Sequence, residues 1–141
     1  MTGWPPCDTE GIRKAVEAAE RMTSAELRVH IARTCSGDPR DKATRIFASL
    51  GMHKTAARNG VLIYVAPASR KWAVLGDGGF QSRVTELFWS ELAEGATTSF
   101  QSGDFTGGIV GIIATCAQEL SIHFPVEPGD RNELPDHVSV E

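Results

Sequence analysis

The sequence has few cysteines, little excess charge of one sign and no apolar run of membrane length. Its three cysteines, Cys7, Cys35 and Cys116, show no CxxC spacing, so neither a disulfide framework nor a zinc knuckle is predicted. The formal net charge of -4 argues against general nucleic-acid binding, which needs a basic surface. We therefore expect a cytoplasmic protein that does not bind nucleic acid.

Membrane signals are equally scarce. The N-terminal stretch MTGWPPCDTEG has no positive region followed by an apolar one, so it does not resemble a signal peptide. The most apolar stretch, 105–117, is bounded by Asp104 and Glu119 and is shorter than the roughly 20 residues that cross a bilayer. This pattern predicts a buried helix and no membrane-spanning segment.

The chain length indicates one domain. At 141 residues, with 41% hydrophobic and 23% charged residues, the chain has the composition of a globular protein with a single core. We place the domain at 8–125. The remainder, 126–141, is an acidic tail that we expect to be extended and packed on the domain, with Leu134 and Pro135 as its anchor.

Four helices are predicted from spacing and capping signals. Asp8 or Thr9 caps the first, whose polar residues, including Glu20, are expected to face water. Asp38, Pro39 and Gly51 mark the start and end of the second. The third is expected to line up five apolar residues on one side: Phe80, Val84, Leu87, Phe88 and Leu92. The fourth runs from about Phe105 to His123 and should be the most buried.

Three strands are predicted between these helices. In the first, Leu27, Val29 and Ile31 alternate with Glu26, Arg28 and His30, which predicts one wet face and a place near a sheet edge. The continuous apolar run VLIYV, Val61 to Val65, predicts a central strand. The stretch PASR then has the length of a hairpin turn, so KWAVLG should form a third strand antiparallel to the central one. The order of elements predicts an α/β fold with a mixed sheet flanked by helices, a three-layer α/β/α sandwich of Rossmann-like type.

Several blocks of the sequence resemble the TPM domain family. These are AERMTSAELRVHIARTCSGDP, ASLGMHKTAARNGVLIYVAPASRKWAVLGDGGF, SGDFTGGI and a closing HFP…NELPD, in the family's order and spacing over about Glu10 to Asp136. The resemblance implies a mixed sheet between helices. It also implies a range of activities, since relatives include a chloroplast branch linked to photosystem II repair and described as an acid phosphatase, calcium-binding members, and an auxiliary receptor subunit. Many relatives carry a signal peptide and a membrane anchor, which this chain does not show.

The block LGDGGF is the first candidate site. It lies where a strand gives way to a helix, so the backbone at Gly76, Gly78 and Gly79 can turn sharply and approach a ligand. Asp77 can contribute oxygen ligands to a cation. The structural alternative is that Asp77 only caps the following helix.

Arg58 and Asn59 form the second candidate site. They immediately precede the central strand, and the hairpin brings GDGG to that same end of the sheet. Arg58 is therefore predicted to lie near Asp77, where it either binds an anion or pairs with the aspartate, while Asn59 can simply form a turn. His53 and Lys54 are expected to interact with the carbonyl end of the preceding helix.

Asp104 in SGDF is the third candidate. If the helix starts lie on the same side of the sheet, Asp77 and Asp104 together can bind calcium or another divalent cation. The structural alternative is again a helix cap.

Two functions remain open on these residues. The first is a non-catalytic module that binds a divalent cation, a small anionic ligand or a protein partner through these loops. The alternative is a metal-dependent phosphatase-like hydrolase of phosphomonoesters, with a cation on Asp77 and Asp104 and Arg58 stabilising phosphate charge. Binding is favoured, because the sequence shows no phosphatase nucleophile motif.

Overall fold

The computed structural model describes residues 3–126 and 138–141, and it places helices on both faces of one mixed sheet. The sheet order is β3-β2-β1-β4, with bounds β1 Leu27–Ile31, β2 Val61–Ala66, β3 Lys71–Gly76 and β4 Val138–Val140. β1 pairs in parallel with β2 and β4, while β2 and β3 are antiparallel. The predicted fold class is confirmed.

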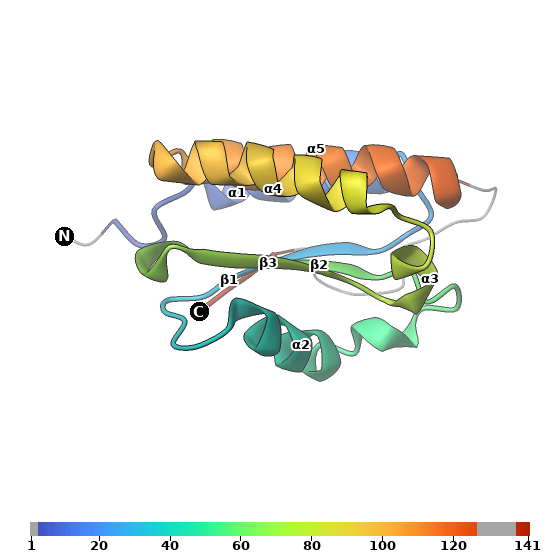
Figure 1. The fold of residues 1–141 in the computed structure, drawn as a ribbon, viewed down its shortest axis with the longest axis horizontal. Helices are drawn as coiled ribbons and strands as arrows, with labels where there is room; N and C mark the ends of the chain where they lie inside the picture. The colour runs from blue at the N-terminus through green and yellow to red at the C-terminus, as the bar shows by residue number, and fades with distance from the viewer. Residues whose placement is uncertain (1–2, 127–137) are drawn as a thin grey trace.

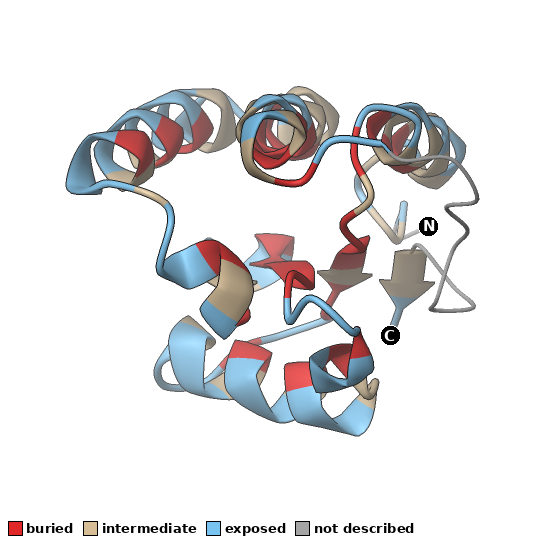
Figure 2. Ribbon diagram, turned by 90° about the vertical axis from the view of Figure 1, so that its right-hand side faces the viewer, coloured by how far each residue is buried: buried red, intermediate tan, exposed pale blue. Residues whose placement is uncertain are grey.

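Three helices cover one face of the sheet: α1 Thr9–Glu20, α4 Glu86–Gln101 and α5 Phe105–His123. Figure 2 shows them side by side in one layer, with their buried residues turned inward. The larger core lies beneath them and includes Val29, Ile63 and Ile112. Leu27, Val29 and Ile31, the apolar residues that alternate along β1, all belong to this core, as the sequence pattern predicts.

The other face is covered by α2, Pro39–Ser49, which Asp38 caps by accepting a hydrogen bond from the Arg40 backbone. Gly51 follows in the left-handed conformation at φ 69°, as predicted for the residue that ends this helix. A second, smaller core lies here and includes Phe47, Leu62 and Tyr64. All six residues of β2 are buried, so the prediction of a central strand is confirmed.

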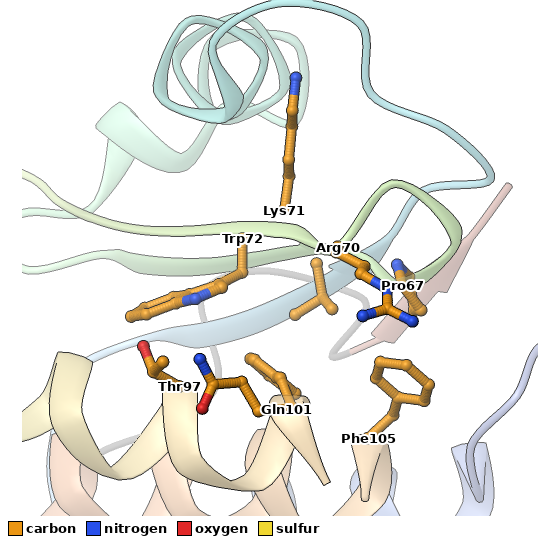
Figure 3. A pocket seen from close by; sticks show the side chains of 9 residues that line it. Pro67, Arg70, Lys71, Trp72, Thr97, Gln101 and Phe105 are labelled. Carbon is orange, nitrogen blue, oxygen red and sulfur yellow. The ribbon is translucent and has the colours of Figure 1, made fainter. Parts of the chain in front are cut away.

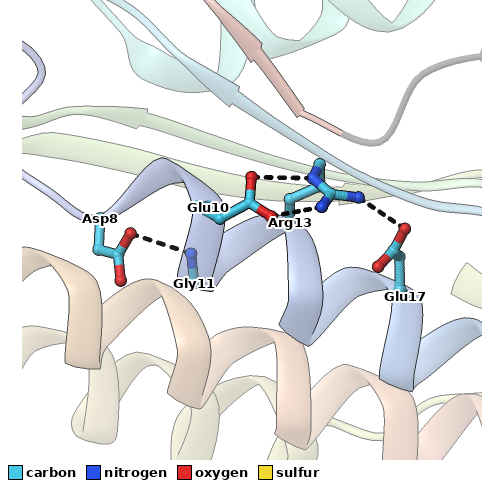
Figure 4. A network of polar contacts seen from close by, with 5 residues as sticks. All are labelled: Asp8, Glu10, Gly11, Arg13 and Glu17. Atoms are coloured by element: carbon cyan, nitrogen blue, oxygen red, sulfur yellow. Dashed lines mark hydrogen bonds and ion pairs between the residues drawn. The ribbon is translucent and has the colours of Figure 1, made fainter.

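α1 begins as the sequence predicts and carries an ion-pair row on its surface (Figure 4). Asp8 accepts a hydrogen bond from the Gly11 backbone, and Arg13 pairs with both Glu10 and Glu17. Exposed pairs of this spacing stabilise a helix by only a few tenths of a kcal/mol each.

The end of α1 differs from the prediction, because Glu20 is partly buried rather than exposed. The pKa of Glu20 is raised to about 8, mainly by burial and in addition by the neighbouring charge and hydrogen bond of Glu26. Glu26 is itself only 3% exposed. A carboxyl placed between a helix end and a buried strand is thus held in its protonated form.

The prediction that β1 has a wet face is also wrong, although β1 does lie near an edge of the sheet, next to the edge strand β4. Glu26 and Arg28 are 3% and 5% exposed, and β4 pairs on the side of β1 that was expected to be open. The C-terminal residues return as a strand, which makes β1 an interior strand. The predicted anchor at Leu134 and Pro135 lies outside the described residues.

The predicted third helix is broken into two. α3 spans only Gly78–Gln81, and α4 starts afresh after Thr85, which caps it by accepting a hydrogen bond from the Phe88 backbone. Leu87 is consequently 65% exposed rather than part of the apolar stripe. The cap at Thr85 starts a new helix, although the spacing of the apolar residues continues through this point.

α5 extends beyond the apolar stretch 105–117 to His123, as predicted, and has 19 residues. By length and composition alone it is apolar enough to cross a membrane, while 39% of its most apolar window is buried inside the protein. It contacts α1, α4 and β2, and these contacts are those of a core helix.

Candidate functional site

The candidate residues meet at the end of the sheet where β2 begins and β3 ends. Val61 is paired with Gly76, and the Asp77 backbone donates a hydrogen bond of 2.8 Å to the Gly60 carbonyl. The antiparallel ladder therefore continues one pair beyond the strands. This places Arg58 and Asp77 next to each other, as the hairpin predicts.

A tight turn fixes the backbone of Arg58. The Arg58 N–H donates to the Thr55 carbonyl over 3.1 Å, and the Asn59 N–H donates to the Thr55 hydroxyl over 3.2 Å. Thr55 is only 3% exposed, so these bonds are sheltered from water. Arg58 itself is left-handed at φ 53°, which is unfavourable for a residue with a side chain.

The Arg58 side chain binds Asp77 in a two-pronged ion pair. Nε donates to Oδ2 over 2.7 Å and Nη2 donates to Oδ1 over 2.9 Å. Asp77 is 8% exposed, whereas the Arg58 side chain is 59% exposed. A buried carboxylate thus holds one edge of the guanidinium, and the other edge faces solvent.

The charge state of Asp77 follows from these contacts. The Arg58 hydrogen bond is the largest cause that lowers the pKa of Asp77; burial opposes it, and the Gly78 N–H and the charges of Arg58 and His53 support it. Conversely, Asp77 raises the pKa of Arg58. Both groups are therefore charged at neutral pH.

The glycines of LGDGGF have separate roles. The Gly79 N–H donates to the Arg58 carbonyl over 2.7 Å, and a Cβ at Gly79 would lie 2.3 Å from the Ala57 carbonyl oxygen. A Cβ at Gly78 would meet nothing within 4 Å. Gly79 is thus required for the close approach of the two loops, whereas Gly78 has room for a side chain and donates its N–H to Asp77 over 2.8 Å.

Gly76 and Asn59 pack inside the site. A Cβ at Gly76 would lie 2.5 Å from the ring of Phe80. Asn59 is 2% exposed, and its side-chain oxygen has no hydrogen-bond partner in the described part of the chain. Both residues therefore pack within the loop, and Arg58 is the candidate whose charged side chain reaches solvent.

Asp104 lies at the opposite end of the sheet. It caps α5 by accepting a hydrogen bond of 2.8 Å from Gly107, and Phe105 beside it lines a pocket with Pro67 and Arg70 of the β2–β3 turn. Figure 1 shows α3 and the start of α5 at the two ends of the molecule. The condition for a shared cation site is therefore not met, because the length of β3 separates Asp77 from Asp104.

The donor groups at Asp77 also do not fit calcium. Both carboxylate oxygens already accept hydrogen bonds from Arg58, and one accepts a third from Gly78. Calcium needs six to eight oxygen ligands. Within 3–126 and 138–141, no three His, Cys, Asp or Glu side chains cluster as metal ligands.

One polar cluster was missed by the sequence reasoning, which assigned no role to His30. His30 stacks on Tyr64, with ring centroids 6.0 Å apart, and joins Ser139 at 2.7 Å and Glu141 at 2.8 Å. The only available signal was the alternation that puts His30 on one face of β1. His30 thereby connects β1 to the end of the chain.

Comparison with known proteins identifies the family. A family model described as the TPM domain matches residues 6–119, so the chain belongs to the TPM domain family. A search of curated proteins finds no match.

Two solved structures are similar to this chain. The BA42 protein from the psychrophilic bacterium Bizionia argentinensis has a TM-score of 0.86 and 34% identity, over 96% of this chain and 95% of that one. The N-terminal domain of the cg2496 protein from Corynebacterium glutamicum has a TM-score of 0.58 and 15% identity, over 91% and 78% of the two chains. The second likeness concerns the fold alone.

Proposed function

We propose that this TPM-domain protein is a non-catalytic binding module that recognises an anionic group, a carboxylate or phosphate of a small ligand or protein partner, at the Arg58 end of the sheet. The proposal rests on one observation: Asp77 binds one edge of the Arg58 guanidinium and leaves the other edge open. Nε and Nη2 are held by Asp77, and Nη1 makes no hydrogen bond to a described residue. An oriented guanidinium with a free edge matches the planar geometry of such anions.

The local charge supports an anion over a cation. Lys54 is exposed on the loop that leads to Arg58, and His53 is close enough to Asp77 to lower its pKa. Asp77 is buried and paired, so a ligand approaching from solvent meets mainly the basic side chains. This electrostatic asymmetry favours negative groups.

The same geometry argues against acid-base chemistry at Asp77. A general base must accept a proton from a substrate, but both oxygens of Asp77 already accept hydrogen bonds and its pKa lies below its usual value. The metal-dependent phosphatase stays a prediction, as does binding of calcium or another divalent cation.

A phosphate titration followed by NMR tests the proposal. Inorganic phosphate, and separately a short acidic peptide, should give saturable shifts at residues 53–60 and 76–79. The proposal would be contradicted if phosphate gave no saturable shift there, or if the peptide gave none.

A phosphatase assay separates binding from catalysis. We expect no turnover of p-nitrophenyl phosphate with calcium, magnesium or manganese. Turnover that is lost in Asp77→Ala would favour the hydrolase instead.

A calcium titration tests the cation independently. Saturable shifts at residues 76–79 on adding calcium would mean that the ion displaces Arg58 from Asp77. That result would contradict recognition of anions at this site.

A further inference from the structure

A cavity lies at the far end of the hairpin from Arg58. It has a volume of about 370 Å³, is open to solvent on one side, and lies between the β2–β3 turn and the junction of α4 and α5. Figure 3 shows Trp72 and Arg70 on the strand side, with Thr97, Gln101 and Phe105 facing them from the helices. This volume is within the range of small-ligand pockets in proteins, about 300 to 1,000 Å³.

Three aromatic side chains form the apolar wall of this cavity. The rings of Trp72 and Phe100 meet edge to face with centroids 6.1 Å apart, and Phe100 and Phe105 lie 6.0 Å apart. All three side chains are only partly buried. They therefore offer apolar surface that a planar ring can cover.

One positively charged side chain at the cavity, that of Arg70, forms no salt bridge with a described residue. The Arg70 guanidinium lies beside Phe105 and Pro67 at the mouth of the cavity (Figure 3). Lys71 points away, because its amine donates a hydrogen bond of 2.7 Å to the Gly37 carbonyl. Among the described residues, the lining contains no carboxylate.

Arg70 occupies a backbone position where arginine is unfavourable. It ends the turn in the left-handed conformation at φ 55°, and its N–H donates to the Pro67 carbonyl over 3.0 Å. Glycine or asparagine adopts this conformation at lower cost. An unfavourable residue at the mouth of a pocket points to a role for its side chain.

We propose that this pocket binds a small aromatic carboxylate. The ring lies against Trp72, Phe100 and Phe105, and the carboxylate pairs with the Arg70 guanidinium. The Gln101 amide and the Thr97 hydroxyl face Trp72 across the cavity (Figure 3) and supply further hydrogen-bonding groups. The site is separate from Arg58, which lies at the opposite end of β3, and does not depend on the function proposed there.

The first test needs no variant. The wild-type protein is titrated with 3-phenylpropionate, with the neutral 3-phenylpropanamide, and with propionate, and backbone NMR shifts are followed. Saturable shifts at residues 70–72 and 97–105 are expected with 3-phenylpropionate, at least about tenfold weaker binding with the amide because the charge-assisted pair is lost, and weaker binding with propionate. No saturable shift with 3-phenylpropionate, or equal binding of acid and amide, would overturn the proposal.

The second test removes the charge while keeping the turn. Arg70→Asn retains a residue suited to the left-handed conformation and should weaken 3-phenylpropionate binding about tenfold or more. Arg21→Asn, at the exposed end of α1, removes the same charge elsewhere and should leave binding within about twofold. Equal weakening in both variants, or none in Arg70→Asn, would overturn the role of Arg70.

Discussion

Arg58 and Asp77 form a two-pronged ion pair in which the aspartate is 8% exposed and the arginine side chain 59% exposed. The pair joins the loop before β2 to the end of β3 and leaves the outer edge of the guanidinium in solvent. Asp77 therefore fixes the orientation of Arg58, and in the function we propose Arg58 is the group that meets the ligand.

Replacing Asp77 tests the contribution of this pair to stability. Asp77→Asn should lower the free energy of unfolding at pH 7 by about 1–3 kcal/mol, because charged hydrogen bonds are lost. The pKa of Asp77 is lowered by folding, so its stabilisation is present above its unfolded pKa and is lost as the pH falls through the lower, folded value. The deficit of the variant should shrink accordingly in urea unfolding below pH 4.

Asp104→Asn is the matched control for that experiment. Asp104 only caps α5, and asparagine caps a helix about as well as aspartate. Its free energy of unfolding should change by less than about 0.5 kcal/mol. An equal loss in both variants would contradict the special role of Asp77.

The two adjacent glycines of the site provide a second matched pair. Gly79→Ala forces a Cβ against the Ala57 and Arg58 carbonyls and should destabilise the protein by about 1–3 kcal/mol, as overpacking does. Gly78→Ala has open space and should be near neutral. Thermal unfolding of both variants checks this; equal melting temperatures would mean that the loops do not approach as described.

Glu20 makes stability depend on pH in the opposite sense to Asp77. Its pKa rises on folding to about 8, so the folded state is favoured while Glu20 is protonated, and this advantage is lost between about pH 4.5 and pH 8. Glu20→Gln should therefore raise the free energy of unfolding more at pH 8 than at pH 5. A pH-independent effect in denaturant unfolding would contradict the raised pKa.

His30 is predicted to hold the C-terminal strand in place. His30→Phe keeps a ring on Tyr64 but loses the bonds to Ser139 and Glu141. Amide hydrogen exchange in 138–141 should become roughly thirtyfold faster, since each of the two lost bonds contributes about 1 kcal/mol. Ser139→Ala removes one bond and should have a smaller effect; unchanged exchange in His30→Phe would contradict this role.

The sequence predicts the fold well where local signals agree. Asp38 and Gly51 mark the ends of α2, and the apolar run after Gly60 forms the central strand, because caps and burial act within a few residues. The closeness of Arg58 and Asp77 also follows from sequence, since a hairpin fixes which residues share an end of the sheet.

Features that depend on contacts between distant parts of the chain are not predicted by these local signals. The separation of Asp77 from Asp104 depends on the direction in which α5 runs over the sheet, and the interior place of β1 depends on its pairing with β4, far along the chain. The pocket at Arg70 likewise combines a turn with two helix ends. No spacing rule within one segment reports such contacts.

The most direct test of the central claim is a phosphate titration of three proteins followed by NMR: the wild type, Arg58→Asn and Arg45→Asn. Asparagine suits the left-handed position of Arg58, and Arg45 is an exposed arginine on α2. We predict saturable shifts at 53–60 and 76–79 in the wild type and in Arg45→Asn, and binding weakened about tenfold or more in Arg58→Asn. Equal binding by all three proteins, or no binding by the wild type, would contradict recognition of anions by Arg58.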